Sequence, residues 1–523
     1  MSTAHPPSAS AMSADSPLGG RATRILRYAV LALSGVVGIA WLATAVVHAA
    51  DRFGVGHGQG VWMALGAAAL DGTLYPPLYE HGMVGGTRWM PAPILLQAAL
   101  DGVSGDPLLA QRLAGALVAV PLYGLGYVIL RRFEVGRVLA IGLLACVLAT
   151  PAGFAAALDG GADQLAVLCQ LGALALVFWS TGRRAAAAAG ALCALALLAK
   201  LTAIWAVVAI ALVLLVRERR RAVPFLATYV IVAAALLGAT EFASRGRFTD
   251  NVLALGGSGF EGLGAVAGEA PGRVLMIAQD FDQAVWLLAP LAVLALARAV
   301  TVKGIDVFHV AWLAAVAVLV VTLADIGAWF NHTLDVAFLT VLLAARVTAG
   351  SDSASVTLRA VATVTVAIGL AGAIFTPADG TFSPRAALVS LAHRETGSDY
   401  PARPLAGIVS DNDTVLMEDP GLAVSLGRQP VVLDPFMLAR LDVERPEVAE
   451  ALARRVEEQE FDMVVLINRL AESRFWYTDI HLGPSVSTAI CRAYRQSGAV
   501  GGQVLYTPRP RNLSSATLSS CFD

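Results

Sequence analysis

The chain has 523 residues, of which 57% are hydrophobic and 15% are charged, and its mean hydropathy is +0.68. Soluble globular proteins carry about 25% charged residues, so this composition argues against a soluble multidomain enzyme and, over most of the length, against disorder. The formal net charge of −2 gives no indication of nucleic-acid binding. We therefore predict an α-helical polytopic membrane protein.

The N-terminal segment, residues 1–24, is rich in proline, serine and alanine, and we expect a disordered cytoplasmic tail there. Arg21, Arg24 and Arg27 then precede an apolar run from Tyr28 to Ala50. This run is long enough to span a bilayer, which needs about 20 residues. The apolar core of a signal peptide is only about 7–15 residues long, so we interpret the run as an uncleaved first transmembrane helix.

Ten further apolar runs follow, which brings the expected number of transmembrane helices to about eleven. They lie near residues 107–130, 137–158, 163–181, 185–199, 201–216, 222–243, 284–299, 307–325, 333–349 and 359–376. Every second connection is rich in arginine, which the positive-inside rule assigns to the cytoplasm. This alternation predicts a multi-pass protein with a cytoplasmic N-terminus and an external C-terminus. We expect it in the bacterial inner (plasma) membrane. The runs 185–199 and 201–216 are short, so both could cross or they could form a re-entrant hairpin.

The predicted organisation therefore has three parts. Residues 1–24 form the tail, residues 25–376 form the transmembrane domain, and residues 377–523 form an extracytoplasmic domain. On the outer side, the transmembrane domain carries two long loops, 51–106 and 244–283.

The C-terminal region has the sequence pattern of an α/β domain. Thr414–Met417, Pro430–Leu433 and Met463–Ile467 are short apolar runs typical of strands, and Arg445–Glu460 is a charged amphipathic helix. Cys491 and Cys521 both lie in this region, where an oxidising compartment would favour a disulfide between them.

Ionisable side chains beside membrane spans are costly to place and therefore indicate candidate functional sites. In this chain they gather at the outer ends of the predicted spans. The set comprises Asp51, His57, Glu80, His81, Arg88, Asp159, Asp163, Lys200, Asp325, Asn331, His332 and Asp335. A helical bundle can bring these ends together in an outward-facing polar cleft. Such a cleft could hold an anionic, lipid-linked substrate and supply a general base.

Several of these residues also have a simpler structural interpretation. Asp51 could mark the end of a span, His81 could be solvated in a polar loop, and Lys200 could extend its ammonium to the interface. Lysine is rare in this chain, since all but two of the 37 basic residues are arginines, and this favours a functional role for Lys200. Asn331 and Asp335 share a helical face, which fits either a helix–helix hydrogen bond or a substrate contact.

The first predicted outer loop carries an ordered series of motifs. A helix-like segment at Val61–Leu70 is followed by Gly72 and Tyr75, then by a basic, proline-containing segment at Arg88–Pro93 and a G-D…R-L segment at Gly105–Leu113. In this order the loop resembles the GT-C fold glycosyltransferases that use polyprenyl-phosphate sugars. The resemblance is greatest to the family 39, ArnT-like and RgtA/B/C/D-like bacterial branch.

Segments further along the chain are similar to the same branch. They surround Asp163, Lys200 and Asn331–His332, and one lies in the C-terminal region at Glu418–Pro435. The resemblance implies a GT-C-like transmembrane domain. It also implies transfer of a sugar from a polyprenyl-phosphate donor to a glycan, lipid or protein acceptor of the cell envelope, on the outer face of the lipid bilayer.

The catalytic base that the resemblance implies is missing from its expected place. The family's first-loop acidic pair aligns with Gly58 and Gln59, neither of which accepts a proton at neutral pH. Asp51 or His57 could substitute, Asp163 or Glu80 could take the role, or the protein could be non-catalytic.

The resemblance also implies which residues contact the donor. Arg88, Arg112 and Lys200 would neutralise the departing phosphate. Further candidates for substrate binding are Glu80, His81, Asn331 and His332. Related enzymes often use a divalent metal at the phosphate, so such a metal is an open alternative, although the available ligands are scattered along the sequence.

Two other functions remain open from the sequence. A non-catalytic GT-C-like protein could bind a lipid-linked glycan or a partner protein, which the substitution at Gly58 and Gln59 favours. A transporter of lipid or polysaccharide is the other alternative. Transporters usually contain internal repeats, and the sequence shows no convincing repeat.

Overall fold

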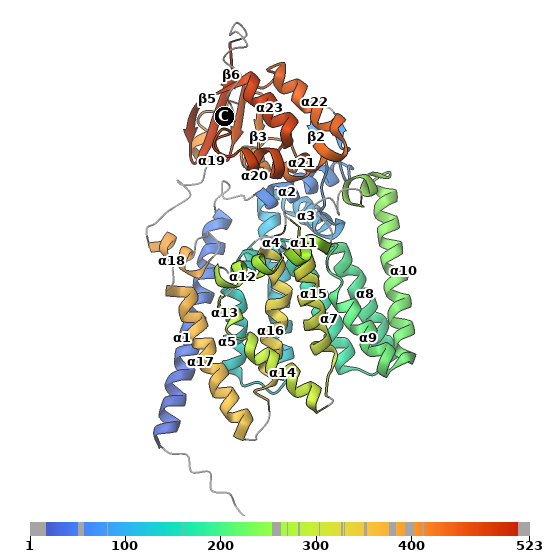
Figure 1. Ribbon diagram of the computed structural model, residues 1–523, viewed down its shortest axis with the longest axis vertical. Coiled ribbons are helices and arrows are strands. Elements are labelled where there is room, and N and C mark those ends of the chain that lie inside the picture. The colour runs from blue at the N-terminus through green and yellow to red at the C-terminus, as the bar shows by residue number, and fades with distance from the viewer. Residues whose placement is uncertain are drawn as a thin grey trace, which may run out of the picture.

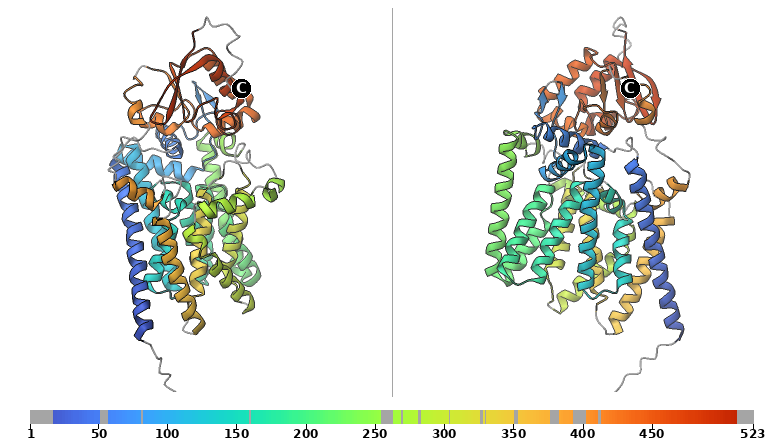
Figure 2. Two further views of the ribbon diagram at one scale, coloured as in Figure 1. Left: turned by 60° about the vertical axis from the view of Figure 1, so that its left-hand side comes forward. Right: turned by 180° about the vertical axis from the view of Figure 1, so that it is seen from behind.

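The computed structural model of the chain combines a long bundle of helices with a smaller domain that contains a β-sheet (Figure 1). The structure describes the chain apart from residues 1–16, 51–56, 81, 159, 254–262, 269, 281–282, 303, 326–327, 329, 350–352, 376–382, 393–401, 411–412 and 511–523. The sheet caps one end of the bundle in all three views (Figures 1 and 2). The predicted fold class, an α-helical membrane protein with a C-terminal α/β domain, is confirmed.

The helical part runs from α1 to α17, with a short hairpin between α2 and α3. The helices are α1 (Pro17–Ala50), α2 (His57–Leu70), α3 (Pro91–Ser104), α4 (Pro107–Arg132), α5 (Arg137–Leu148), α6 (Pro151–Leu158), α7 (Ala162–Trp179), α8 (Arg183–Ala199), α9 (Trp205–Arg217), α10 (Arg219–Ala243), α11 (Leu263–Gly268), α12 (Ala270–Asp280), α13 (Gln283–Trp286), α14 (Ala289–Thr301), α15 (Val307–Thr322), α16 (Leu334–Arg346) and α17 (Ser353–Phe375). The hairpin consists of β1 (Tyr79–Glu80) and β2 (Met83–Val84), which pair antiparallel.

Six of the described helical segments are long and apolar enough to cross a membrane. They are Gly20–Val47, Pro107–Arg132, Ala162–Trp179, Arg219–Ala243, Gln283–Thr301 and Ser353–Phe375. The predicted span 137–158 is divided into α5 and α6, which meet at an angle of 83° and would make a seventh crossing if they form one broken span. The runs 185–199 and 201–216 form two separate helices, α8 and α9. The total of about eleven crossings stays a prediction.

The break between α5 and α6 has a local cause. Pro151 is the first residue of α6, where its missing N–H costs nothing, but it cannot continue the hydrogen bonding of α5. Thr150 fills the gap, because its hydroxyl donates to the carbonyl of Val147 at 2.8 Å and accepts the N–H of Gly153 at 3.0 Å. The chain therefore turns sharply here, so that α6 leaves α5 at an angle of 83°.

The sheet domain, from α19 to β6, is built on four strands in the order β3-β4-β6-β5. Its strands are β3 (Val415–Met417), β4 (Met463–Leu466), β5 (Tyr494–Val500) and β6 (Gln503–Pro508), and its helices are α19 (Ala402–Leu405), α20 (Pro420–Ser425), α21 (Pro435–Glu444), α22 (Pro446–Glu457) and α23 (Gly483–Ala493), while α18 (Pro384–Ala392) precedes it. Strands β3 and β4 are parallel, and the other two pairs are antiparallel. The predicted strands at Thr414–Met417 and Met463–Ile467 and the helix within Arg445–Glu460 are therefore present. Pro430–Leu433 does not join this sheet.

A buried carboxylate organises the interior of the sheet domain. Glu418 follows β3, is 1% exposed, and accepts the backbone N–H of Ile467 at 2.8 Å. Its two oxygens also accept the indole N–H of Trp476 at 2.8 Å and the hydroxyl of Tyr477 at 3.0 Å. His481 Nδ1 lies 2.7 Å from the same carboxylate. A buried charge is tolerated when it is satisfied in this way, so Glu418 links β3 to the segment before α23.

The first loop and the sheet domain are docked against each other. Val84 of β2 donates its N–H to Val431 at 2.7 Å and accepts the N–H of Leu433 at 3.0 Å, which makes an isolated parallel bridge. Pro430–Leu433, predicted as a strand, therefore pairs with the first loop. Helix α20 packs on α2 so closely that Gly60 lies directly against the backbone of Gly421.

Candidate functional site

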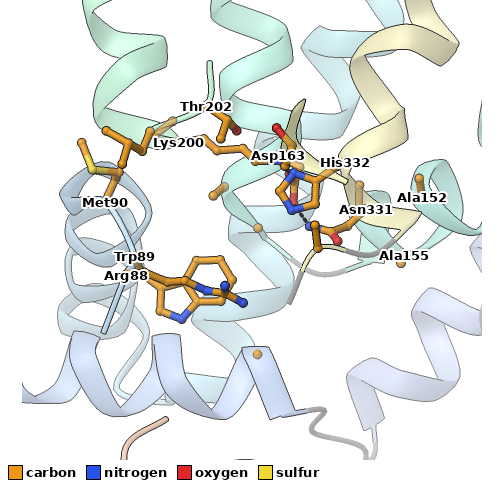
Figure 3. Close-up of a pocket in the computed structure, with 18 of the residues that line it drawn as sticks. Arg88, Trp89, Met90, Ala152, Ala155, Asp163, Lys200, Thr202, Asn331 and His332 are labelled. Carbon is orange, nitrogen blue, oxygen red and sulfur yellow. Dashed lines mark hydrogen bonds and ion pairs between the residues drawn. The ribbon is translucent and has the colours of Figure 1, made fainter. Parts of the chain in front are cut away.

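A cavity of about 570 Å³ lies beside α2, the helix that packs against α20 of the sheet domain, and Figure 3 shows residues that line it. Its wall comes from α2, the segment 88–90, α6, the start of α7, the turn between α8 and α9, and the residues between α15 and α16. The lining residues that carry polar or aromatic groups are Gln59, Trp62, Arg88, Trp89, Asp163, Lys200, Thr202, Thr322, Asp325, Phe330, Asn331 and His332. Segments that are far apart in the sequence thus converge on one space.

One wall of the cavity, here called the charged wall, carries Asp163, Lys200, Asn331 and His332. It contains an ion pair. Lys200 Nζ pairs with Asp163 Oδ1, and the two side chains are 13% and 14% exposed. Asn331 donates its amide N–H to the other oxygen of Asp163 at 3.3 Å. Figure 3 shows Asp163, Lys200, Asn331 and His332 clustered together. Both carboxylate oxygens of Asp163 are therefore engaged.

The positions of these charges follow from helix ends. Asp163 lies in the first turn of α7, where the helix dipole favours a negative charge. Lys200 directly follows the last residue of α8 and donates its backbone N–H to the carbonyl of Ala196 at 2.9 Å, so its ammonium lies near the negative end of that helix. Asp335, in the first turn of α16, accepts the indole N–H of Trp205 at 2.8 Å. The helix ends thus favour the sign of the charge at Asp163 and at Lys200, which the bundle places beside one another.

The opposite wall, here called the aromatic wall, carries Trp62 and Trp89. It also carries Arg88, the second cation of the cavity. The rings of Trp62 and Trp89 meet edge to face, with centroids 4.8 Å apart and planes at 63°. Arg88, the residue before Trp89, places its guanidinium carbon 4.3 Å from the centre of the Phe436 ring. Phe436 belongs to α21 and is 6% exposed, so a cavity residue is held by the sheet domain.

The segment that carries Arg88 and Trp89 is fixed by hydrogen bonds on both sides. Gly86 has a φ of +92° and donates its N–H to the side chain of Asn251 at 3.1 Å. The amide group of Asn251 in turn donates to the carbonyl of Pro76 at 3.1 Å. Tyr75 donates its hydroxyl to the carbonyl of Trp89 at 2.8 Å. The loop is therefore held rigidly at the cavity.

The structure brings together six of the predicted candidates. Arg88, Asp163, Lys200, Asp325, Asn331 and His332 all line the cavity. Gly58 and Gln59, where the sequence resemblance implies an acidic pair, line it as well.

Other predicted site residues lie elsewhere or are not described. Among the described lining residues neither Glu80, which is in β1, nor Arg112, which is in α4, is present. Asp51, His81 and Asp159 lie outside the described residues, and His57 is described only as the first residue of α2.

The sequence left a divalent metal open and predicted a disulfide between Cys491 and Cys521. Among the described residues, no group of three or more His, Cys, Asp or Glu side chains is arranged to hold a metal ion. Cys491 is disulfide-bonded, whereas Cys521 lies outside the described residues, so their pairing stays a prediction.

The sequence analysis missed the aromatic wall. Trp62 and Trp89 were not among the candidate residues, although both lie in the loop with the family-like motifs and Trp89 directly follows a candidate arginine. Large aromatic rings in a loop beside basic residues are a signal that could have identified them. Thr202, in the turn after Lys200, was also missed.

Comparison with known proteins identifies the fold. No family model and no curated protein matches the chain. Among solved structures, ArnT from Cupriavidus metallidurans bound to undecaprenyl phosphate is similar, with a TM-score of 0.58 and 13% identity over 92% of this chain and 98% of that one. The apo state of the same protein gives a TM-score of 0.56 and 14% identity over 90% and 98% of the two chains. The predicted GT-C fold is thereby confirmed, and the finer RgtA/B/C/D-like branch stays a prediction.

Proposed function

We propose that the protein is a membrane glycosyltransferase that moves a sugar from a polyprenyl-phosphate donor to an acceptor of the cell envelope, on the outer face of the bacterial plasma membrane. The observation that carries this proposal is the cavity lined by Arg88, Lys200 and Asp163 in a chain with the fold of ArnT. ArnT was solved with undecaprenyl phosphate bound. A cavity with two cations and a carboxylate fits the phosphate of such a donor and the acceptor hydroxyl.

The two cations lie on opposite walls, so a phosphate between them would contact both. Arg88 comes from the first loop and Lys200 from the turn after α8. The guanidinium offers a planar, bidentate donor set, and the ammonium offers a compact charge. Both would stabilise the charge that develops on the phosphate oxygen as the bond to the sugar breaks.

Among the candidate bases, Asp163 lines the cavity, and we assign the role of the base to it. Its pairing with Lys200 and Asn331 occupies both oxygens in the absence of donor. A bound phosphate would compete for Lys200 and release one oxygen of Asp163. That oxygen would take the proton of the acceptor hydroxyl, whose oxygen then bonds to the anomeric carbon as the bond from that carbon to the phosphate oxygen breaks. The anomeric centre is inverted, and polyprenyl phosphate leaves. Asp51 and His57 remain the alternative bases.

Binding of undecaprenyl phosphate to the protein in lipid nanodiscs tests the phosphate site. Arg88→Gln and Lys200→Gln should each weaken binding by about 10-fold or more, because a charge-assisted hydrogen bond contributes about 1.5–3 kcal/mol. Arg298→Gln is the matched control, since Arg298 lies in the last turn of α14, at the end of the bundle away from the sheet domain (Figure 1). Equal affinity in all three variants would contradict the proposed phosphate site.

Sugar transfer is tested by complementation of a deletion strain, with envelope glycans compared by mass spectrometry. The wild-type gene should restore a glycan that the deletion strain lacks. Asp163→Asn keeps the shape of the side chain but cannot accept a proton, so it should restore little of that glycan. Full restoration by Asp163→Asn would exclude Asp163 as the base.

A second candidate function is supported by Gly58 and Gln59. Both line the cavity. The sequence resemblance implies an acidic pair at these two positions, and without it the chain could bind a lipid-linked glycan but not transfer it. Tight binding of undecaprenyl phosphate, combined with unchanged envelope glycans in the deletion strain, would favour this candidate.

A further inference from the structure

The charged wall of the cavity is built from three separate elements of the bundle. Asp163 is in α7, Lys200 is in the turn between α8 and α9, and Asn331 and His332 lie just before α16. Figure 3 shows the side chain of Lys200 extending from its turn toward Asp163. The ion pair between Asp163 and Lys200 therefore depends on how these elements are held relative to one another.

The three elements meet at the first two residues of α9. Trp205, the first residue of α9, donates its indole N–H to Asp335 Oδ1, in the first turn of α16, at 2.8 Å. Ala206 donates its backbone N–H to Gln170 Oε1, in α7, at 3.2 Å. An N–H group in the first turn of a helix has no partner within that helix, so Gln170 satisfies a donor that would otherwise be unpaired. Gln170, Trp205 and Asp335 are here called the α9 anchor.

The α9 anchor lies behind the cavity wall. Gln170 is 0% exposed and Trp205 is 1% exposed, and no member of the anchor is among the described residues that line the cavity. Gln170 is seven residues after Asp163, so both lie on the same face of α7, two turns apart. The anchor is thus placed to hold the charged wall without contacting a ligand in the cavity.

The anchor is connected to Lys200 by a short, hydrogen-bonded turn. Only four residues separate Lys200 from Trp205. Within this turn, Ala203 donates its N–H to the carbonyl of Lys200 at 3.0 Å, and Ile204 donates its N–H to the carbonyl of Thr202 at 2.9 Å. Because the turn is held by its own hydrogen bonds, a movement of Trp205 would also move Lys200.

We propose that the α9 anchor positions Lys200 so that its ammonium can meet both Asp163 and the phosphate of a polyprenyl-phosphate donor. Its members are positioning residues, which contact neither donor nor acceptor and act through Lys200. This inference rests on the proposed function, in which Lys200 is one of the two cations that bind the phosphate.

The test is a double-mutant cycle on the full-length protein in nanodiscs, with undecaprenyl phosphate as the probe. Trp205→Phe keeps a ring but loses the N–H donor, so it should weaken binding about 3- to 10-fold. In the Lys200→Gln background the same substitution should change affinity by less than about 2-fold, because the residue through which it acts is absent. Gln170→Leu loses the acceptor for the N–H of Ala206 and should give the same pattern in both backgrounds.

Trp312→Phe is the matched control. Trp312, in α15, donates its indole N–H to the hydroxyl of Thr340, in α16, at 3.0 Å, and neither is among the described lining residues. This variant loses the same kind of bond to the same helix, so its unfolding temperature should fall as that of Trp205→Phe does. Its affinity for undecaprenyl phosphate should nevertheless remain within about 2-fold of wild type.

Asp335→Asn is the conservative variant of the anchor. Its amide oxygen can still accept the indole N–H of Trp205, and it loses a negative charge. It should therefore bind undecaprenyl phosphate at least as tightly as the wild type. If Asp335→Asn weakens binding as much as Trp205→Phe does, the hydrogen bond does not position Lys200 and the inference is wrong.

The other results separate the inference from the proposed function. Equal effects of Trp205→Phe in the wild-type and Lys200→Gln backgrounds would show that the anchor does not act through Lys200. Equal losses of affinity in Trp205→Phe and Trp312→Phe would show a general loosening of the bundle. Wild-type affinity in Trp205→Phe, with weakened binding in Lys200→Gln, would show that Lys200 needs no anchor. Each of these three results refutes the inference and leaves the proposed function standing. Wild-type affinity in Lys200→Gln would instead contradict the proposed phosphate site, and the inference would fail with it.

Discussion

Replacing Gly60 by alanine should force α2 away from the sheet domain. A Cβ atom at this position would lie 2.3 Å from the backbone nitrogen of Gly421 and 2.6 Å from the carbonyl carbon of Pro420. Ordinary contacts of a Cβ atom begin at 3.4 Å, so the two backbones would have to separate by roughly 1 Å. Neither backbone can move as a flexible side chain does, because both belong to helices and α20 also packs against β3.

The expected cost can be compared with other overpacked contacts. Inserting a methyl group into a closely packed site costs about 1–3 kcal/mol, which would lower the equilibrium constant for docking by roughly 5- to 150-fold. Hydrogen–deuterium exchange of the peptides that contain α2 and α20 measures this loss directly. Both should exchange faster in Gly60→Ala than in wild type.

Gly58→Ala is the matched control because it lies on the same helix, and a Cβ there would have no heavy atom within 4 Å. It should leave exchange in α20 unchanged, and the better helix propensity of alanine should stabilise α2 by up to about 1 kcal/mol. If Gly60→Ala and Gly58→Ala give the same exchange rates in α20, then the close contact between Gly60 and Gly421 does not hold the two parts together, and the reasoning is wrong.

Two further variants test the sheet domain. Phe436→Leu keeps an apolar side chain but removes the ring under Arg88, so affinity for undecaprenyl phosphate should fall about 2- to 5-fold. An unchanged dissociation constant would show that the Phe436 ring does not support Arg88 in binding. Glu418→Gln exchanges a carboxylate oxygen for a donor, so the sheet domain should lose about 2–4 kcal/mol of stability in denaturant unfolding. The control Glu447→Gln, at an exposed residue, should change the free energy of unfolding by less than about 0.5 kcal/mol. Equal losses of stability in the two variants would contradict the role of Glu418.

The sequence predicted the charged wall because it depends on local rules. Charged residues avoid the middle of apolar helices and gather at their ends, so Asp163 and Lys200 were expected on the same side of the membrane. The order of the family-like motifs indicated that Arg88, Asn331 and His332 belong to the same site. Their arrangement into one cavity could only come from the packing of the helices.

The aromatic wall and its supports depend on contacts between distant parts of the chain. Phe436 lies almost 350 residues after Arg88, and no pattern in either segment indicates that they meet. Pro430–Leu433 has the composition of a strand, but its partner is Val84 of the first loop. A strand-like run predicts extended backbone, and the identity of its neighbour is set by docking.

The geometry also changes how the missing acidic pair is understood. Gly58 and Gln59 lie on the same wall as Trp62, whereas Asp163 comes from the opposite wall beside Lys200. A carboxylate facing the cavity is therefore present even though the first loop lacks one. Gly58 has no side chain, and a Cβ atom there would meet no heavy atom within 4 Å, so this part of the cavity wall is open. In the proposed mechanism the acceptor hydroxyl would lie beside Asp163, so a base from α7 would replace the base of the first loop without any change in fold.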